Sequence, residues 1–200
     1  RSASSGIRRL NPHVIPTIGH ASRSTEGLKS FDKSQMINGK TVLAIIPARG
    51  GSKRVPYKNF RNFRGKTLYL WTVEASGKSR YIDHVKISFD NDRPSELCTD
   101  DAKSEDVLRF HLAETPHDFV VLLQPTSPLC TADDIDNCIE LAQSGNPVVS
   151  YNEETNEKNG AVYVATRDWL ATHDFSEPAH TRYFMPASRS LDIDTEADFA

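Results

Sequence analysis

Hydrophobic residues in this chain gather in short runs, and the longer segments between those runs show helical spacing. Five runs are predicted as strands because they are apolar and rich in β-branched residues: Thr41–Ile46, His84–Phe89, Phe119–Leu123, Pro147–Ser150 and Ala161–Ala165. Three segments between them are predicted as helices: Thr67–Gly77, Asp101–Glu114 and Ala132–Ser144. Apolar strands that alternate with helices predict an α/β fold with a doubly wound, mostly parallel sheet flanked by helices.

The third helix has the clearest start signal. Thr131 followed by Asp134 resembles a capping box, and apolar residues recur behind it at helical spacing. Three aspartates crowd this start: Asp133, Asp134 and Asp136. We interpret them as charges that favour a helix N-terminus rather than as metal ligands.

Composition narrows the class of protein. The chain has 200 residues, 38% of them hydrophobic and 26% charged, which is enough for one domain with a core and is typical of neither a disordered nor a membrane protein. We find neither an apolar run of membrane-spanning length nor a signal-peptide core. The three cysteines, Cys98, Cys130 and Cys138, have spacings that suggest neither a zinc site nor a disulfide framework. We therefore expect a cytoplasmic enzyme domain without a membrane partner.

Charge divides the chain into two parts. Residues 1–40 carry seven basic and two acidic side chains, whereas residues 41–200 carry seventeen basic and twenty-five acidic ones. The first part has no sustained periodicity, so residues 1–39 are predicted as an irregular basic extension, with a transit peptide, a cloning remnant or a neighbouring module left open. Residues 40–200 are predicted as the folded domain. Its acidic balance argues against a nucleic-acid partner.

The most informative segment is the loop after the first strand. From Arg49 to Lys66 it carries seven Lys or Arg residues, no Asp or Glu, and an early Gly50-Gly51 pair. Glycines let consecutive backbone N–H groups converge on an anion, and cations supply the charge. The residues alone leave two interpretations open: a polyphosphate site at the carboxyl end of a parallel strand, or a basic surface loop.

Four collinear motifs carry a resemblance to a known family. They are Ile45–Lys53 with Pro56 and Lys58-Asn59; Arg93-Pro94-Ser95-Glu96-Leu97; Leu122–Leu129, which reads L-L-Q-P-T-S-P-L; and Asn159–Tyr163 followed by Ser190–Glu196. Together they are similar to the acylneuraminate cytidylyltransferase (CMP-sialic acid synthetase) family. The resemblance covers roughly residues 40–200 and implies a nucleotide-diphospho-sugar transferase-like, Rossmann-like fold.

The resemblance also implies an activity and a set of site residues. CMP would pass from CTP to the anomeric hydroxyl of a nine-carbon sugar acid of the sialic or legionaminic type, with release of pyrophosphate. Arg49 and Lys58 would be the catalytic cations, and Lys58 would stabilise charge on the leaving group. The expected nucleotide-binding residues are Arg49, Ser52, Lys53, Lys58, Asn59, Arg93, Ser104 and Gln124. Gln124 and Asn159 would bind the sugar.

A metal site is expected at Asp192 and Asp194. Alternate residues of an extended segment point the same way, so both carboxylates could reach one ion. Such a pair alone is more often a surface turn, and it is the resemblance to the family that favours the metal site. Hard oxygen ligands favour Mg²⁺ or Mn²⁺ over zinc. Asp90, which ends the second predicted strand, is a further candidate for placing the metal or the ribose. For Arg93, a plain ion pair with Glu96 remains an alternative to contact with the base.

The chain departs from the family pattern in several places. The family's helix and strand before the Arg93 motif are missing, and a short acidic segment, 151–158, stands where the family has a long insert for sugar recognition and dimerisation. Arg54 replaces the family's usual glycine, and the closing helix is incomplete. The alternatives are therefore a non-catalytic nucleotide-binding remnant, or a cytidylyltransferase for another sugar acid.

Overall fold

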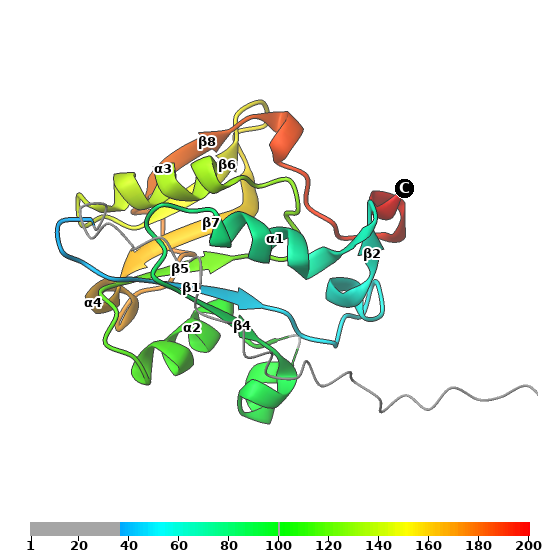
Figure 1. The fold of residues 1–200 in the computed structure, drawn as a ribbon, viewed down its shortest axis with the longest axis horizontal. Coiled ribbons are helices and arrows are strands. Elements are labelled where there is room, and N and C mark those ends of the chain that lie inside the picture. Colours follow the sequence, from blue (N-terminus) through cyan, green and yellow to red (C-terminus); the bar gives the residue numbers. More distant parts are fainter. Residues whose placement is uncertain (1–36, 100) are drawn as a thin grey trace, which may run out of the picture. The chain divides into compact units, whose positions relative to one another are not determined.

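A six-stranded sheet in the order β4-β1-β5-β7-β6-β8 forms the centre of the fold in this computed structural model, which describes residues 37–99 and 101–200 (Figure 1). The strands are β1 Val42–Pro47, β4 His84–Ser88, β5 Phe119–Leu123, β6 Val148–Asn152, β7 Lys158–Thr166 and β8 Thr181–Met185. β1 is parallel to β4 and β5, and β6 is parallel to β8. Only β7 runs antiparallel to its neighbours in this sheet, so the expected mostly parallel α/β fold is confirmed.

Helices cover both faces of this sheet. They are α1 Leu68–Gly77, α2 Ser104–Ala113, α3 Ala132–Ala142 and the short α4 Arg167–Leu170. α1 and α3 lie on one face, and α2 and α4 lie on the other (Figure 1). The three helices predicted from spacing are confirmed with slightly shorter bounds. The capping box of Thr131 and Asp134 at the start of α3 is also present.

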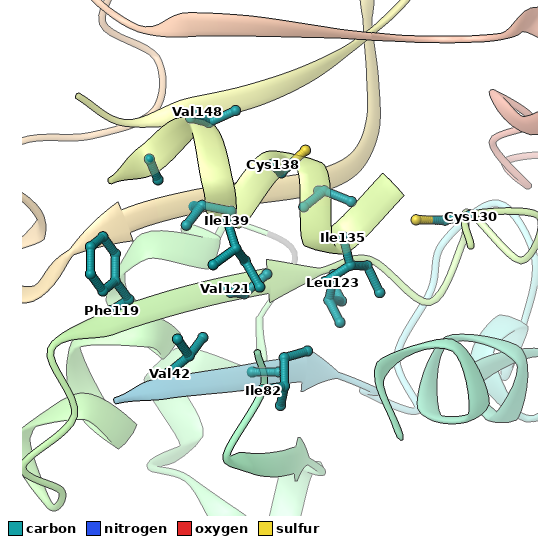
Figure 2. Close-up of a cluster of buried hydrophobic side chains, with 14 of the residues drawn as sticks. Val42, Ile82, Phe119, Val121, Leu123, Cys130, Ile135, Cys138, Ile139 and Val148 are labelled. Atoms are coloured by element: carbon teal, nitrogen blue, oxygen red, sulfur yellow. The ribbon is translucent and has the colours of Figure 1, made fainter. Parts of the chain in front are cut away.

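The continuous apolar runs of β1 and β5 follow from burial on both faces. Val42, Ala44 and Ile46 of β1 contribute to the cluster beneath α3, whereas Leu43 and Ile45 contribute to the cluster beneath α2. β5 alternates in the same way. Figure 2 shows the first cluster, with Ile135 and Ile139 of α3 facing the side chains of β5.

Two of the three aspartates at the start of α3, Asp134 and Asp136, are buried and make structural contacts. Asp134 has no exposed surface and accepts hydrogen bonds from Thr131 and from Nε and Nη2 of Arg189, at 2.9 and 2.8 Å. Asp136 accepts from Ser79 and Arg80. Arg189 lies just before Asp192 in the chain, so the Asp134–Arg189 pair connects this segment to α3.

Three strands and the short helix α4 were not predicted from the pattern. β8 alternates half-buried and exposed residues at the sheet edge, so its apolar signal is weak. The hairpin of β2 Asn62–Phe63 and β3 Lys66–Thr67 is only two residues long on each side. Its turn places both Arg64 and Gly65 at positive φ, at 50° and 86°.

The first 36 residues of the predicted basic extension lie outside the described residues. Ile37 is buried in the core cluster beneath α3 and forms an isolated bridge with Lys40, so the packed region begins slightly earlier than residue 40. In the described part of the chain, we find no helix long and apolar enough to cross a membrane.

Candidate functional site

A cleft of about 580 Å³ opens at the edge of the sheet where β1, β4 and β5 end. Parallel strands end at the same edge, which is where open α/β sheets bind ligands. The cleft collects ten of the eleven residues predicted for the site: Arg49, Ser52, Lys53, Lys58, Asn59, Arg93, Ser104, Gln124, Asp192 and Asp194. The structure thus brings together residues from four separated motifs.

The cationic loop after β1 is held in shape from both ends. Gly50 N donates to Asp90 Oδ2 at 2.7 Å, and a Cβ atom on Gly50 would lie 3.3 Å from that oxygen. A side chain at position 50 would therefore press on Asp90. Asn59, which is buried, donates through Nδ2 to Arg49 O at 3.0 Å. Asp90 and Asn59 thus fix the path of the loop between them.

Lys58 connects this loop to the Asp192–Asp194 segment. Its Nζ atom donates to Ile193 O at 2.8 Å and to Asp194 Oδ1 at 2.9 Å. The other oxygen of Asp194 lies 3.0 Å from Nη1 of Arg54, a largely exposed side chain. Both oxygens of Asp194 therefore face a cation.

The Asp-Ile-Asp segment has the geometry expected of an extended triplet. Ile193 is fully buried against Phe63 and Leu68, and its N–H donates to Thr126 O at 2.8 Å. The two aspartates on either side of it line the cleft. Asp192 is open to the cleft, but the surrounding protein partly desolvates its carboxyl group and raises its pKa. A hydrogen bond with Thr126 acts in the opposite direction and is outweighed.

Gln124 directly follows β5 and lies on the wall of the cleft, as predicted. Its Nε2 atom donates to the Ser104 hydroxyl at the start of α2, at 3.4 Å. Arg93 has a buried side chain, and it pairs with Asp90 at 3.2 Å rather than with Glu96. The alternative of an Arg93–Glu96 ion pair is therefore wrong. The backbone after β4 turns Arg93 back toward Asp90 instead.

Asn159 is the predicted site residue that does not line the cleft. Its side chain is buried, with Oδ1 accepting from Ser150 Oγ at 2.6 Å and Nδ2 donating to Ser190 Oγ at 3.0 Å. Asn159 is thus held by Ser150 and Ser190 at the start of β7 and lies outside the cleft lining. Gly160, at a φ of 74°, follows it and lines the cleft instead.

Sequence reasoning missed Tyr163, which lines the same cleft. Tyr163 belongs to the Asn159–Tyr163 motif, so the motif could have drawn attention to it. The motif alone does not show that the Tyr163 side chain points into the cleft. Burial raises the pKa of its phenol to about 12, with further contributions from Asp192, Glu105 and Tyr151. The Tyr163 side chain is therefore a neutral hydroxyl at neutral pH.

The donors in the cleft suit a hard divalent cation, although they are few. Asp192 and Asp194 offer carboxylate oxygens only, and Asp192 carries a partly desolvated charge without a salt bridge in the described part of the chain. No group of three or more His, Cys, Asp or Glu residues among residues 37–99 and 101–200 could hold a metal ion. A pair of carboxylates fits Mg²⁺, which keeps several waters and binds substrate phosphates.

The chain is an α/β protein with a cationic cleft at the carboxyl edge of its sheet, and comparison with known proteins identifies its family. A family model described as Cytidylyltransferase matches residues 43–181. The chain belongs to the cytidylyltransferase family, which confirms the resemblance seen in the motifs.

Two relatives show the extent of the similarity. The chain is 29% identical to the CMP-N,N'-diacetyllegionaminic acid synthase of Legionella pneumophila, over 80% of this chain and 93% of that protein. It is 27% identical to the N-acylneuraminate cytidylyltransferase of Escherichia coli O18:K1:H7, over 79% of this chain. The chain spans about half the length of this second relative. The first alignment has 219 positions, whereas 80% of this 200-residue chain supplies far fewer residues. The alignment therefore includes segments of that relative that have no counterpart in this chain.

Solved structures agree on the fold. A CMP:2-keto-3-deoxy-manno-octonic acid synthetase in complex with CTP superposes with a TM-score of 0.62 at 14% identity, over 78% of this chain and 94% of that one. A cytidylyltransferase from Leptospira borgpetersenii gives a TM-score of 0.58 at 17% identity, over 80% and 84% of the two chains. At these identities the similarity supports the fold alone.

Proposed function

We propose that this chain transfers CMP from CTP to the anomeric hydroxyl of a nine-carbon sugar acid of the sialic or legionaminic type and releases pyrophosphate. The observation that carries the proposal is the cleft at the carboxyl ends of β1, β4 and β5. There, the cations of one loop face two carboxylates, with the Gln124 amide between β5 and α2. Family membership and the names of the relatives support CMP transfer to such an acid.

The phosphates of CTP would lie against the loop after β1. Arg49, Ser52 and Lys53 line the cleft there, and cations lower the barrier by stabilising charge that develops on the departing pyrophosphate. Lys58 is suited to that task because its ammonium group is held in place by Ile193 O and Asp194. We assign Arg49 and Lys58 as the catalytic cations and Asn59 as the support of the loop.

The nucleoside and the sugar would occupy the other wall of the cleft. Arg93 and Ser104 are proposed to face the cytosine base, and Gln124 to contact both substrates. The bond that forms joins the anomeric oxygen to the α-phosphorus, and the bond that breaks joins that phosphorus to the pyrophosphate oxygen. The proton of the anomeric hydroxyl leaves to solvent or to a base.

Asp192 and Asp194 are proposed to hold Mg²⁺ or Mn²⁺. The ion would supply positive charge to the phosphate oxygens during transfer. Because Asp194 is paired with Lys58 and Arg54, a bound ion would compete with these cations for its carboxylate. The proposal places the reaction in the cytoplasm, which agrees with the free thiols of Cys98, Cys130 and Cys138.

The test is pyrophosphate release from CTP with Mg²⁺ and a panel of acids. The panel contains N,N'-diacetyllegionaminic acid, N-acetylneuraminic acid, pseudaminic acid and 3-deoxy-manno-octulosonate. Turnover with a nine-carbon acid supports the proposal, and turnover with the eight-carbon acid alone replaces it. If CTP binds in a calorimetric titration but no acid gives pyrophosphate, the chain is a nucleotide-binding remnant and the proposal fails.

A further inference from the structure

A second, smaller pocket of about 200 Å³ continues from the cleft and has its own cation. It is lined by Ser104, Glu105, Leu122, Gln124, Lys158, Tyr163, Phe175 and Ser176. Ser104, Gln124 and Tyr163 line both pockets, so the two spaces meet at these three side chains. A ligand held here would lie next to a nucleotide in the main cleft.

Lys158, the first residue of β7, has spare hydrogen-bonding capacity in this pocket. Its Nζ atom donates to Phe175 O at 2.7 Å. An ammonium group has three N–H donors, so two remain for a ligand. Among the described residues, Lys158 forms no salt bridge with an Asp or Glu, and Glu105 is the acidic residue that lines the same pocket.

Tyr163 and Gln124 add neutral polar groups where the pockets meet. The Tyr163 hydroxyl donates to no acceptor in the described part of the chain, and its raised pKa keeps the proton on the oxygen. The Gln124 amide makes only a long, 3.4 Å bond to Ser104. Both groups are therefore available to a ligand.

Glu105 faces the same pocket and limits where an anion can sit. Its Oε1 accepts a hydrogen bond from Phe175 N at 3.1 Å. Glu105 and Lys158 therefore bind the N–H and the C=O of the same residue, Phe175. A carboxylate beside Glu105 would be repelled, whereas one beside Lys158 would be attracted. An anionic group of a ligand would therefore bind beside Lys158, and hydroxyl or amide N–H donors beside Glu105.

We propose that Lys158 binds the carboxylate of the sugar acid and sets the preference of the enzyme for acidic over neutral sugars. This inference rests on the proposed function and adds a residue to it. In these acids the carboxylate is attached to the anomeric carbon, so its anchor must lie beside the reacting hydroxyl. Lys158 lines the pocket that meets the cleft at Gln124 and Tyr163, whereas Arg49, Lys53 and Lys58 line only the main cleft.

The experiment compares the acid that the wild type uses with its methyl ester, which keeps the shape of the sugar but removes the charge. The variants are Lys158→Ala, Lys158→Arg and, as a matched control, Lys86→Ala on the surface of β4. KM values for the acid and the ester are measured at saturating CTP, and thermal unfolding confirms the fold. Dissociation constants of the acid for the enzyme–CTP complex without metal give a readout that needs no turnover.

Loss of a charge-assisted hydrogen bond predicts that Lys158→Ala raises the KM for the acid by about 10- to 100-fold. The KM for the ester and the KM for CTP should stay within about twofold, so the preference for the acid disappears. Lys158→Arg should restore most of it, and Lys86→Ala should behave as wild type.

The outcomes separate the two proposals. If the wild type prefers the acid and Lys158→Ala keeps that preference, this inference is overturned and the proposed function stands. If Lys158→Ala weakens acid and ester equally, Lys158 merely supports Phe175, which also overturns the inference. If the wild type neither turns over nor binds any acid, both proposals fail. Binding without turnover, with the preference lost in Lys158→Ala, supports the inference and contradicts the proposed function.

Discussion

The ammonium group of Lys58 lies 2.9 Å from Oδ1 of Asp194, although 136 residues separate the two in the chain. This contact joins the phosphate loop to the expected metal ligands. The side chain of Lys58 is largely buried, whereas Asp194 is partly exposed. A cation held this firmly does not need to be reorganised when charge develops on a substrate, which is the condition for electrostatic catalysis.

Lys58→Ala should therefore lower kcat by about 100- to 1,000-fold, the usual cost of losing one preorganised donor to a developing charge. The KM for CTP should change much less, because the other cations of the loop remain. Steady-state pyrophosphate release measures both constants. Lys78→Ala, which removes an exposed lysine paired with Glu74 on α1, serves as the control. A Lys58→Ala enzyme with unchanged kcat would exclude the role assigned to Lys58.

Arg54 should compete with the divalent cation for Asp194. Its guanidinium is 3.0 Å from Oδ2 of that carboxylate, and exposed pairs of this kind contribute about 0.2–1 kcal/mol. Arg54→Ala should therefore strengthen Mn²⁺ binding by about 1.5- to 5-fold, as measured by electron paramagnetic resonance of free Mn²⁺. Arg64→Ala changes the net charge equally but lies outside the cleft lining, and should leave binding unchanged. Weaker binding in Arg54→Ala would show that Arg54 does not oppose the ion.

Asp192 should stabilise metal binding at the expense of folding stability. Desolvation raises its folded pKa above the ordinary 3.8, so the ionised form is disfavoured in the folded protein. This cost is present at neutral pH and vanishes as the pH falls below 3.8, where the group is protonated in both states.

Asp192→Asn should accordingly unfold at pH 7 at the same temperature as wild type or higher, while Mn²⁺ binding weakens by at least about 10-fold. The difference in melting temperature should shrink as the pH is lowered toward 4. Differential scanning calorimetry across this range, with and without Mn²⁺, gives both results. A variant that melts clearly below wild type at pH 7 without metal would contradict the assigned cost.

The sequence was sufficient to predict the parts of the site that are local. Gly50-Gly51 with Lys53 and Lys58 follows an apolar strand, and a parallel sheet brings such a loop to the ligand-binding edge. Asp192 and Asp194 also point into the cleft because the residue between them is apolar and buried. Strand periodicity and residue chemistry indicated where these residues lie, whereas the resemblance to the family was needed to choose a phosphate and metal site over a basic surface loop and a surface turn.

The remaining features depend on packing between distant segments. No local pattern shows that Asp194 pairs with Arg54, or that the Tyr163 hydroxyl reaches the junction of two pockets. Asn159 was assigned to the sugar because the resemblance to the family implies that role for its motif, but its amide bonds with Ser150 and Ser190. Its neighbour Gly160, at positive φ, faces the cleft.

The Asp134–Arg189 pair shows how such packing can be tested. Burial alone would raise the pKa of Asp134, but hydrogen bonds from Arg189 and Thr131 outweigh it and lower the pKa. Asp134 is fully buried, whereas Arg189 is about one-third exposed. Removing the arginine leaves an uncompensated buried charge, while removing the carboxylate leaves a guanidinium that can reach water.

Arg189→Ala should therefore cost about 3–5 kcal/mol in the free energy of unfolding at pH 7, and Asp134→Asn should cost less. Urea denaturation measures both, with Arg182→Ala as an exposed control on β8. Because the wild-type carboxyl has a lowered pKa, the stability contributed by the pair should be present above 3.8 and lost as the pH falls through the folded pKa. Equal costs for the two variants would mean that the buried carboxylate gains enough from Thr131 and Tyr183 to remain charged without Arg189.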